Sequence, residues 1–315
     1  MLQVATLTSQ FLTSSPKQRA QAAIPRISEL NPRVSIQSGG SLSTLLSLTD
    51  PSYYTQYDCV ICCDHDFTTL STINTAARFA GRPFYAAGIH GFYGFIFADL
   101  VTHDYIIQRE QSNRPTPTKP ETSTRSTISV TSKKESDGKT TEIVTKRENY
   151  CPLILANSSP LEFSIRHNAR KLRQVPSLLP CLRALFDFQR TYLRLPNPQT
   201  PQDLAAYSNM VLEHVKQLSL PDGAVQGDFL RSFIQMIGAE IVPTAAFVGG
   251  RLAEDVINVL GKREQPVQNF ALFDGEAMVA PIYCLFTTPP EMAVAGLGGA
   301  GAAAAEVEGG VVLAA

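Results

Sequence analysis

The chain has 315 residues, of which 44% are hydrophobic and 17% charged, and its formal net charge is −1. This composition predicts a globular chain with a substantial core, and a charge so close to zero gives no overall electrostatic footprint for nucleic acid or an anionic membrane. No apolar run approaches the roughly 20 residues that span a bilayer, and no secretory signal opens the chain, so we expect a reducing compartment for its cysteines.

Hydrophobic periodicity indicates the elements of the first hundred residues. In chain order they are a helix over 18–30, a short strand over 34–36, a strand over 57–63, a helix over 67–80, a strand over 83–87 and a strand over 94–100. The Asn31-Pro32 pair ends the first helix, because proline disfavours helical geometry in the residue before it. Alternation of strands and helices predicts an α/β fold with a parallel sheet.

The middle of the chain changes in composition. Residues 109–149 are rich in Ser, Thr and Lys and hold few apolar side chains. Such a segment buries too little surface to offset its ordering entropy, so we predict a mobile loop. Residues 150–237 are predicted to form a small helical insertion with amphipathic helices over 178–195, 203–218 and 228–238.

A long apolar helix is expected at 242–260, with Gly249 and Gly250 inside it and Gly261 as its C-cap. Each internal glycine costs about 1 kcal/mol relative to alanine, which is usually offset by close packing on that face. Strands over 269–273 and 280–285 then form a hairpin around Asp274 and Gly275. The Gly/Ala-rich residues 289–315 are predicted to be disordered.

The cysteines invite a metal or redox interpretation through Cys59, Cys62 and Cys63. A structural zinc site needs four ligands, and residues three apart on a strand point to opposite faces. Small buried hydrophobes are therefore the favoured interpretation. Cys151 and Cys181 have no histidine nearby in the sequence, so the nucleophile interpretation is the weaker one for both.

The Asp64-His65-Asp66 turn follows a predicted strand, where α/β proteins place ligands. Metal binding there remains an alternative, but a helix-capping acidic turn is the commoner use of these residues. Gly88, Gly91 and Gly94 recur every three residues, which matches neither the dinucleotide-binding nor the P-loop pattern.

Several segments together carry a family resemblance. They are residues 9–12 with Arg19 and Ala20, residues 30–34, 57–60 and 84–100, and the C-terminal stretches 243–250, 253–256, 269–270 and 273–275. In order and spacing they resemble the adenylating fold of bacterial ThiF/MoeB proteins and of the enzymes that activate ubiquitin-like proteins. Within that group they most resemble the small, non-cysteine subunits of heterodimeric SUMO-activating enzymes.

The resemblance implies a Rossmann-like ThiF/MoeB adenylation fold that is incomplete at the N-terminus, because active members begin with a strand and a Gly-rich ATP loop. The adenylation fold is expected over residues 1–108 and 238–288. The mobile loop (109–149) and the helical insertion (150–237) lie between these two parts, and the disordered tail (289–315) follows them. Arg19 and Asp64 match ATP-site positions, but Ser9 replaces an arginine and His65 an asparagine. The resemblance therefore implies a degenerate nucleotide site, no catalytic residue and no metal ligand in this chain.

The resemblance also implies partners and cofactors. These are the large subunit that carries the catalytic cysteine, SUMO, and ATP with Mg²⁺ bound mainly by the large subunit. Gly91, Gly94, Gly249 and Gly250 are then expected at the interface between subunits, although packing inside this chain's own core explains them equally well. No nucleic acid or membrane partner is expected, and the family implies a nuclear location, with the cytoplasm as an alternative.

Three other hypotheses remain open. The first is that the chain is a non-catalytic scaffold or truncated pseudo-enzyme of the ThiF/MoeB family. The second is that the chain is a self-sufficient MoeB-type enzyme, although paired Cys-x-x-Cys motifs for zinc are missing from the sequence. The third is that the chain is the equivalent subunit of the activating enzyme for another ubiquitin-like protein. That subunit normally carries a longer helical insertion.

Overall fold

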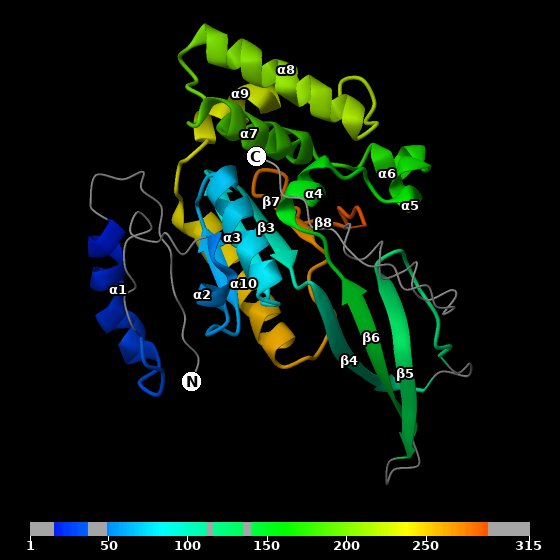
Figure 1. The fold of residues 1–315 in the computed structure, drawn as a ribbon. Coiled ribbons are helices and arrows are strands. Elements are labelled where there is room, and N and C mark those ends of the chain that lie inside the picture. Colours follow the sequence, from blue (N-terminus) through cyan, green and yellow to red (C-terminus); the bar gives the residue numbers. More distant parts are fainter. Residues whose placement is uncertain (1–15, 37–48, 112–115, 135–139, 289–315) are drawn as a thin grey trace, which may run out of the picture.

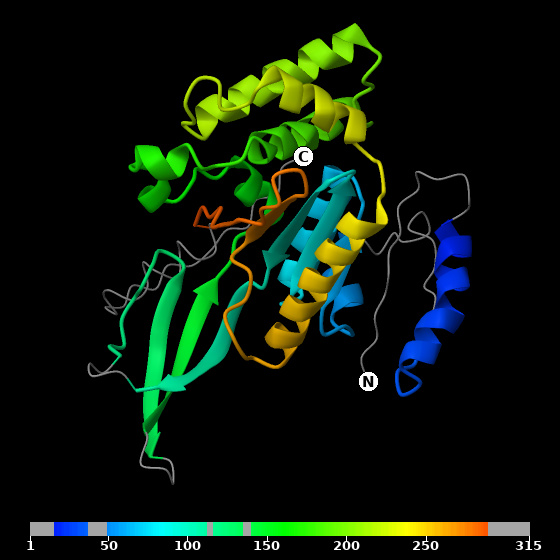
Figure 2. The same cartoon turned by 180° about the vertical axis from the view of Figure 1, so that it is seen from behind.

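A computed structural model describes residues 16–36, 49–111, 116–134 and 140–288. Its main sheet has the strand order β1-β2-β3-β7-β8, with helices on both faces (Figures 1 and 2). The strands are β1 (Val60–Cys63), β2 (Phe84–His90), β3 (Tyr93–Asp99), β7 (Phe270–Asp274) and β8 (Ile282–Tyr283). The structure confirms the strands predicted over 57–63, 83–87 and 94–100 and the C-terminal hairpin, although their ends differ from the predicted ones. Helix and sheet content agree with a Rossmann-like fold.

The predicted parallel sheet is wrong beyond its first pair. Strand β1 runs parallel to β2, but the β2–β3, β3–β7 and β7–β8 pairs are antiparallel. The reason lies in the turn between β2 and β3, where Gly91 has φ +62° and only Gly91 and Phe92 separate the strands. So short a connection reverses the chain into a hairpin, whereas a parallel crossover needs a dozen residues or more.

The N-terminal helices are α1 (Pro16–Leu30), α2 (Pro51–Tyr54) and α3 (Phe67–Phe79). The helices predicted over 18–30 and 67–80 are therefore confirmed. The strand predicted over 34–36 is wrong: Val34 donates its backbone N–H to Asn31 O at 3.1 Å, which closes a turn after the helix. In the described part of the chain, no helix is both long and apolar enough to cross a membrane.

Two hydrophobic clusters cover the two faces of the main sheet. Phe84, Phe95 and Phe97 contribute to the larger cluster, which also contains the buried sides of α3 and α7. Tyr85 and Ile96 point the other way and pack with α10 (Val242–Leu260). Strands covered on both faces have few exposed side chains, and every residue of β3 is buried.

The mobile loop predicted over 109–149 is wrong for most of its length. Strands β4 (Thr102–Glu110), β5 (Arg125–Lys134) and β6 (Thr140–Asn149) form a second antiparallel sheet in the order β4-β6-β5. These strands are rich in polar and β-branched residues, which suit a largely solvated sheet. Cross-strand ion pairs such as Arg147–Asp104 at 2.7 Å add to the ladder, a contribution that composition alone does not reveal.

The segment 150–237 is helical, as predicted, and it shares its core with the main sheet. It forms α4 (Leu153–Ser158), α5 (Phe163–Arg166), α6 (Ala169–Leu172), α7 (Leu178–Tyr192), α8 (Pro201–Gln217) and α9 (Gly227–Met236). The three longer helices match the predicted ones. Helix α7 contacts both α3 and β7, and its buried face belongs to the same core cluster as the sheet. The predicted disordered tail, 289–315, lies outside the described residues.

Candidate functional site

Asp64 lies at the carboxyl end of β1, with φ +55°. Its Oδ1 accepts a hydrogen bond from the backbone N–H of Ile89 at 3.1 Å, and its own N–H donates to Ala87 O at 2.9 Å. The carboxylate therefore ties the end of β1 to β2. This is the end of the parallel pair, where α/β folds place ligands.

Asp66, two residues further on, caps α3. Its Oδ1 accepts from the N–H of Thr69 at 3.0 Å, and its Oδ2 accepts from the Thr69 hydroxyl at 2.6 Å. The helix-capping interpretation of this acidic turn is thus confirmed. Within the described ranges, the structure contains no group of three or more His, Cys, Asp or Glu side chains arranged to hold a metal.

Arg19, the other residue predicted at a nucleotide site, lies on α1. Its side chain belongs to the part of the chain left undescribed, and Figure 1 draws α1 to one side of the main sheet. The role of Arg19 at a nucleotide site therefore stays a prediction. Asp64 is already bound to the neighbouring strand, so its role as a nucleotide ligand stays a prediction.

A buried polar cluster that the sequence did not single out joins α3 to the end of β3. The fully buried Asp99 accepts from Asn74 Nδ2 at 2.9 Å and from Arg78 Nη1 at 2.6 Å. Burial raises the pKa of Asp99, while the Arg78 charge opposes that shift. Because Asn74 Oδ1 also accepts from the N–H of Leu153, the cluster orients helix α4 as well.

The four glycines predicted at a subunit interface divide into two pairs. A Cβ atom on Gly91 would lie 2.7 Å from Met236 Cβ, and one on Gly94 would lie 2.7 Å from Val248 Cγ2. Those two glycines permit close packing inside this chain. By contrast, a Cβ atom on Gly249 or Gly250 would meet nothing within 4 Å.

Helix α10 carries an uncovered face of small and apolar residues. We call this the α10 face; it consists of Val242, Ala246, Gly249, Gly250, Ala253 and Ile257, all exposed. Val242 is 80% exposed and Ile257 68%. The opposite side of the helix, including Val248 and Leu252, is buried against the sheet. A helix that is apolar on both sides is typical of one buried between two layers of protein.

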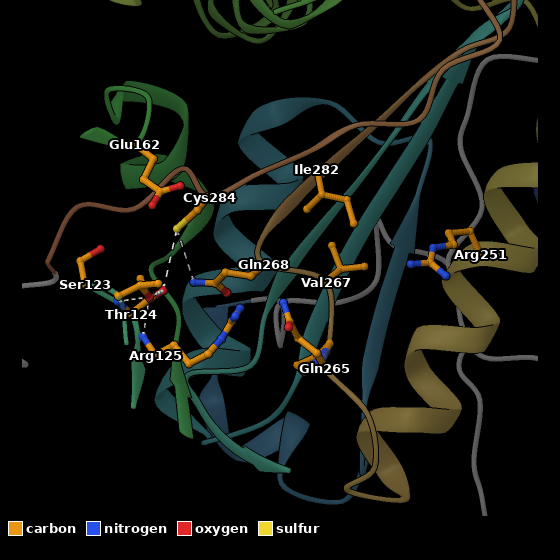
Figure 3. A pocket seen from close by; sticks show the side chains of 12 residues that line it. Ser123, Thr124, Arg125, Glu162, Arg251, Gln265, Val267, Gln268, Ile282 and Cys284 are labelled. Atoms are coloured by element: carbon orange, nitrogen blue, oxygen red, sulfur yellow. Dashed lines mark hydrogen bonds between the residues drawn. The ribbon is translucent and has the colours of Figure 1, made fainter. Parts of the chain in front are cut away.

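A pocket of about 400 Å³ opens between the two sheets, and Figure 3 shows side chains from five separate segments around it. Arg125 Nε donates to Glu148 at 2.5 Å, and Thr124 Oγ1 donates to the same carboxylate at 2.6 Å. Gln268 Nε2 lies 3.8 Å from Cys284 Sγ, while Arg251 reaches the pocket from α10. Gln268 Nε2 also donates to Asn149 O at 2.9 Å, so these polar side chains are tied to residues behind the pocket wall.

A second pocket of about 340 Å³ borders α10 at Phe247, Val248 and Arg251. Phe247 and Phe273 stack at its rim with ring centroids 4.1 Å apart and planes inclined by 23°. Arg251 and Ile282 line both pockets. The surface beside α10 therefore includes an aromatic pair, of which Phe247 is exposed and Phe273 partly buried, as well as the small residues of the α10 face.

Burial favours the neutral thiol form of the cysteines. Cys62 packs in the larger core cluster and Cys59 in the α10 cluster, which confirms that they lie on opposite faces of the sheet. Burial raises the pKa of Cys59 and of Cys151 to about 12, and that of Cys63 to about 11. Burial also raises the pKa of Cys284 above its usual value. A thiol that stays protonated at neutral pH is a poor nucleophile.

Comparison with known proteins agrees with this architecture. The model of the ThiF family matches residues 6–284. The chain is 32% identical over 286 residues to "DNA damage tolerance protein RHC31" of Saccharomyces cerevisiae, covering 88% of this chain and 79% of that protein. It is 27% identical over 267 residues to "DNA damage tolerance protein rad31" of Schizosaccharomyces pombe, covering 85% of this chain and 72% of that protein. It is 27% identical over 285 residues to "SUMO-activating enzyme subunit 1" of Xenopus laevis, covering 88% of this chain and 77% of that protein.

Proposed function

This chain belongs to the ThiF family, and from that premise we propose that it is the small, non-cysteine subunit of a heterodimeric SUMO-activating enzyme. The proposal follows the name of the relatives called SUMO-activating enzyme subunit 1. The reaction that the heterodimer supports is ATP-dependent adenylation of the SUMO C-terminus, followed by thioester formation on the large subunit's cysteine. The role of this chain is structural within that reaction.

The α10 face is the observation that carries this proposal. It leaves one apolar side of a long helix uncovered in a chain whose main sheet is otherwise covered by helices on both faces. Gly249 and Gly250 leave open space against that helix, which permits close approach of a second backbone. A large exposed apolar surface on a soluble domain marks an interaction site. We assign the large subunit to this surface.

The division of labour between subunits is also part of the proposal. Raised pKa values of the cysteine thiols support a thioester cysteine on the large subunit. Asp64 and Asp66 are engaged in holding β2 and capping α3, so ATP and Mg²⁺ are assigned mainly to the large subunit. Mg²⁺ would neutralise phosphate charge there. We further propose a nuclear location, in keeping with the proposed role.

The direct test of assembly is co-expression of this chain with the large SUMO-activating subunit of the same organism. A single species at the mass of a one-to-one complex in size-exclusion chromatography with light scattering is the expected result. A parallel co-expression with the large subunit of another modifier's activating enzyme tests specificity. Failure to form the SUMO-pathway complex, or equal assembly with both partners, would count against the proposal.

A further inference from the structure

A cluster of basic side chains covers the two short helices α5 and α6. We call it the basic patch; it consists of Arg166, Arg170, Lys171 and Arg173, all exposed. The eight residues from Arg166 to Arg173 also include His167 and contain no acidic residue. Glu162 is the nearest acidic residue before them in the sequence. The near-neutral charge of the whole chain does not reveal this local concentration of positive charge.

Among the described residues, the charges of the basic patch have no acidic partner, unlike those of several other exposed arginines of the chain. Elsewhere, Arg147 pairs with Asp104 at 2.7 Å and Arg251 with Glu254 at 2.6 Å. Within the described ranges, none of the four basic side chains of the patch forms an ion pair. Like charges placed together repel one another, so this arrangement stores unfavourable electrostatic energy that an acidic ligand would relieve.

The patch is held in place by the core. Ile165 and Leu172 pack against the larger hydrophobic cluster from α5 and α6 respectively. Asn168 Oδ1 caps α6 by accepting from the backbone N–H groups of Arg170 at 3.0 Å and Lys171 at 3.2 Å. The backbone under the charges is therefore fixed before any ligand arrives, which lowers the entropic cost of binding.

An aromatic platform adjoins the basic side chains. Phe163 is 67% exposed, and its ring stacks on His167 with centroids 3.8 Å apart and planes inclined by 26°. An exposed aromatic ring beside unpaired guanidinium groups offers both an apolar contact and charge-assisted hydrogen bonds. Tyrosine, tryptophan, phenylalanine and arginine are enriched in protein interfaces for these reasons.

We propose that the basic patch binds an acidic peptide segment of a partner protein, with an apolar side chain of that segment on Phe163. Three of the four basic residues are arginines, whose planar guanidinium groups match carboxylates in two-pronged geometry. A nucleic acid is the less favoured ligand, because the patch is short and the chain has a net charge of −1.

The patch lies apart from the proposed subunit interface. Figures 1 and 2 both place α5 and α6 at the outer end of the helical layer, away from α10. An acidic segment can therefore bind while the α10 face is covered. This inference does not depend on the proposed function, because it rests on the charges and contacts of α5 and α6 alone.

The test is fluorescence anisotropy with the full chain and a labelled peptide of six glutamates and one phenylalanine. A glutamine peptide of the same length and a 12-nucleotide single-stranded DNA are the comparison probes. The triple variant R166Q/R170Q/K171Q removes three charges of the patch. The matched control R231Q/R263Q/K216Q removes three exposed charges elsewhere. Circular dichroism confirms that both variants keep the helical content of the wild type.

We expect the glutamate peptide to bind, the glutamine peptide not to bind, and affinity to fall with added salt. The patch variant should raise Kd by about tenfold or more, with the control within about twofold of wild type. Phe163→Ala should weaken binding without changing its dependence on salt. Equal affinity of the patch variant and the wild type would overturn the proposal, as would tighter binding of the DNA than of the glutamate peptide.

Discussion

Tyr85 on β2 donates its hydroxyl hydrogen to Asp255 Oδ2 on α10 at 2.7 Å. The second oxygen of Asp255 accepts from the backbone N–H of Val267 at 2.9 Å. One buried carboxylate thus fixes α10 to the sheet and to the segment that leads into β7. This attachment sets the rotation of α10 about its axis, and so determines that Gly249 and Gly250 point outward while Val248 points inward.

Replacing Tyr85 with phenylalanine should destabilise the fold, because it removes this hydrogen bond while Asp255 stays buried. The expected loss is about 1–3 kcal/mol of unfolding free energy, the usual penalty for an unsatisfied buried partner. Urea denaturation followed by circular dichroism measures it. Tyr192→Phe, at an exposed tyrosine on α7, serves as the control and should change stability by less than about 0.5 kcal/mol. Equal stability of Tyr85→Phe and wild type would show that the contact does not hold α10.

The two pairs of glycines should respond in opposite ways to alanine. In Gly94→Ala, the new Cβ atom would lie 2.7 Å from Val248 Cγ2, so we expect a loss of about 1–3 kcal/mol. In Gly249→Ala, the new methyl group meets open space on a helix, and the isolated chain should gain up to about 1 kcal/mol. Thermal denaturation of both variants and the wild type measures these changes in stability. A loss for Gly249→Ala in the isolated chain would mean that this side of α10 is not open.

A charge on the α10 face should prevent assembly without unfolding the chain. In Ile257→Asp, a side chain that is 68% exposed becomes charged, so the stability of the isolated chain should change by less than about 1 kcal/mol. Binding to the large subunit should weaken by about a hundredfold, because a carboxylate would be buried at the interface. Biolayer interferometry gives the Kd values.

The matched control for that experiment is Leu212→Asp on α8, where the leucine is 57% exposed and lies outside the α10 face. It introduces the same charge and should leave the Kd unchanged. If Leu212→Asp weakened binding as much as Ile257→Asp, the α10 face would not be the subunit interface.

The Arg194–Asp203 pair should contribute stability that disappears in acid. The Arg194 side chain, followed by the N–H of Asn197, lowers the pKa of Asp203 from 3.8 to about 2. A lowered pKa in the folded state means that the stabilisation is complete above the unfolded value and is lost as pH falls through the folded value. The difference in urea midpoint between wild type and Asp203→Asn should therefore be constant above pH ~5 and narrow from about pH 4 towards pH 2. A difference that stays constant down to pH 2 would contradict this assignment.

The sequence predicted the elements of the main core because their apolar residues recur with a clear period. Helix α10 is the best example, since its bounds agree at both ends with the predicted 242–260. Antiparallel pairing of β2 with β3 was missed because the direction of a strand depends on its connection, here Gly91 and Phe92. The second sheet was missed because it is stabilised by cross-strand polar pairs, and composition alone does not distinguish such strands from a solvated loop.

The candidate site was predicted only in part for a similar physical reason. The sequence singled out four glycines for close packing, but only the structure separates Gly94, which packs on Val248, from Gly249, which faces open space. Asp255 was part of a recognised motif, yet its bond to Tyr85 spans 170 positions of the chain and leaves no local pattern. The basic patch was readable from the sequence as a charge run, but the absence of ion-pair partners for it among the described residues was not.

The measurement that tests the central claim most directly is the charging of SUMO on the large subunit. Purified large subunit, labelled SUMO, ATP and Mg²⁺ are incubated with and without this chain, and products are separated on a non-reducing gel. We predict a SUMO thioester on the large subunit that requires both this chain and ATP, and that thiol reductant removes. Equal charging with and without this chain, or no charging by the assembled complex, would contradict its assignment as the small subunit of a SUMO-activating enzyme.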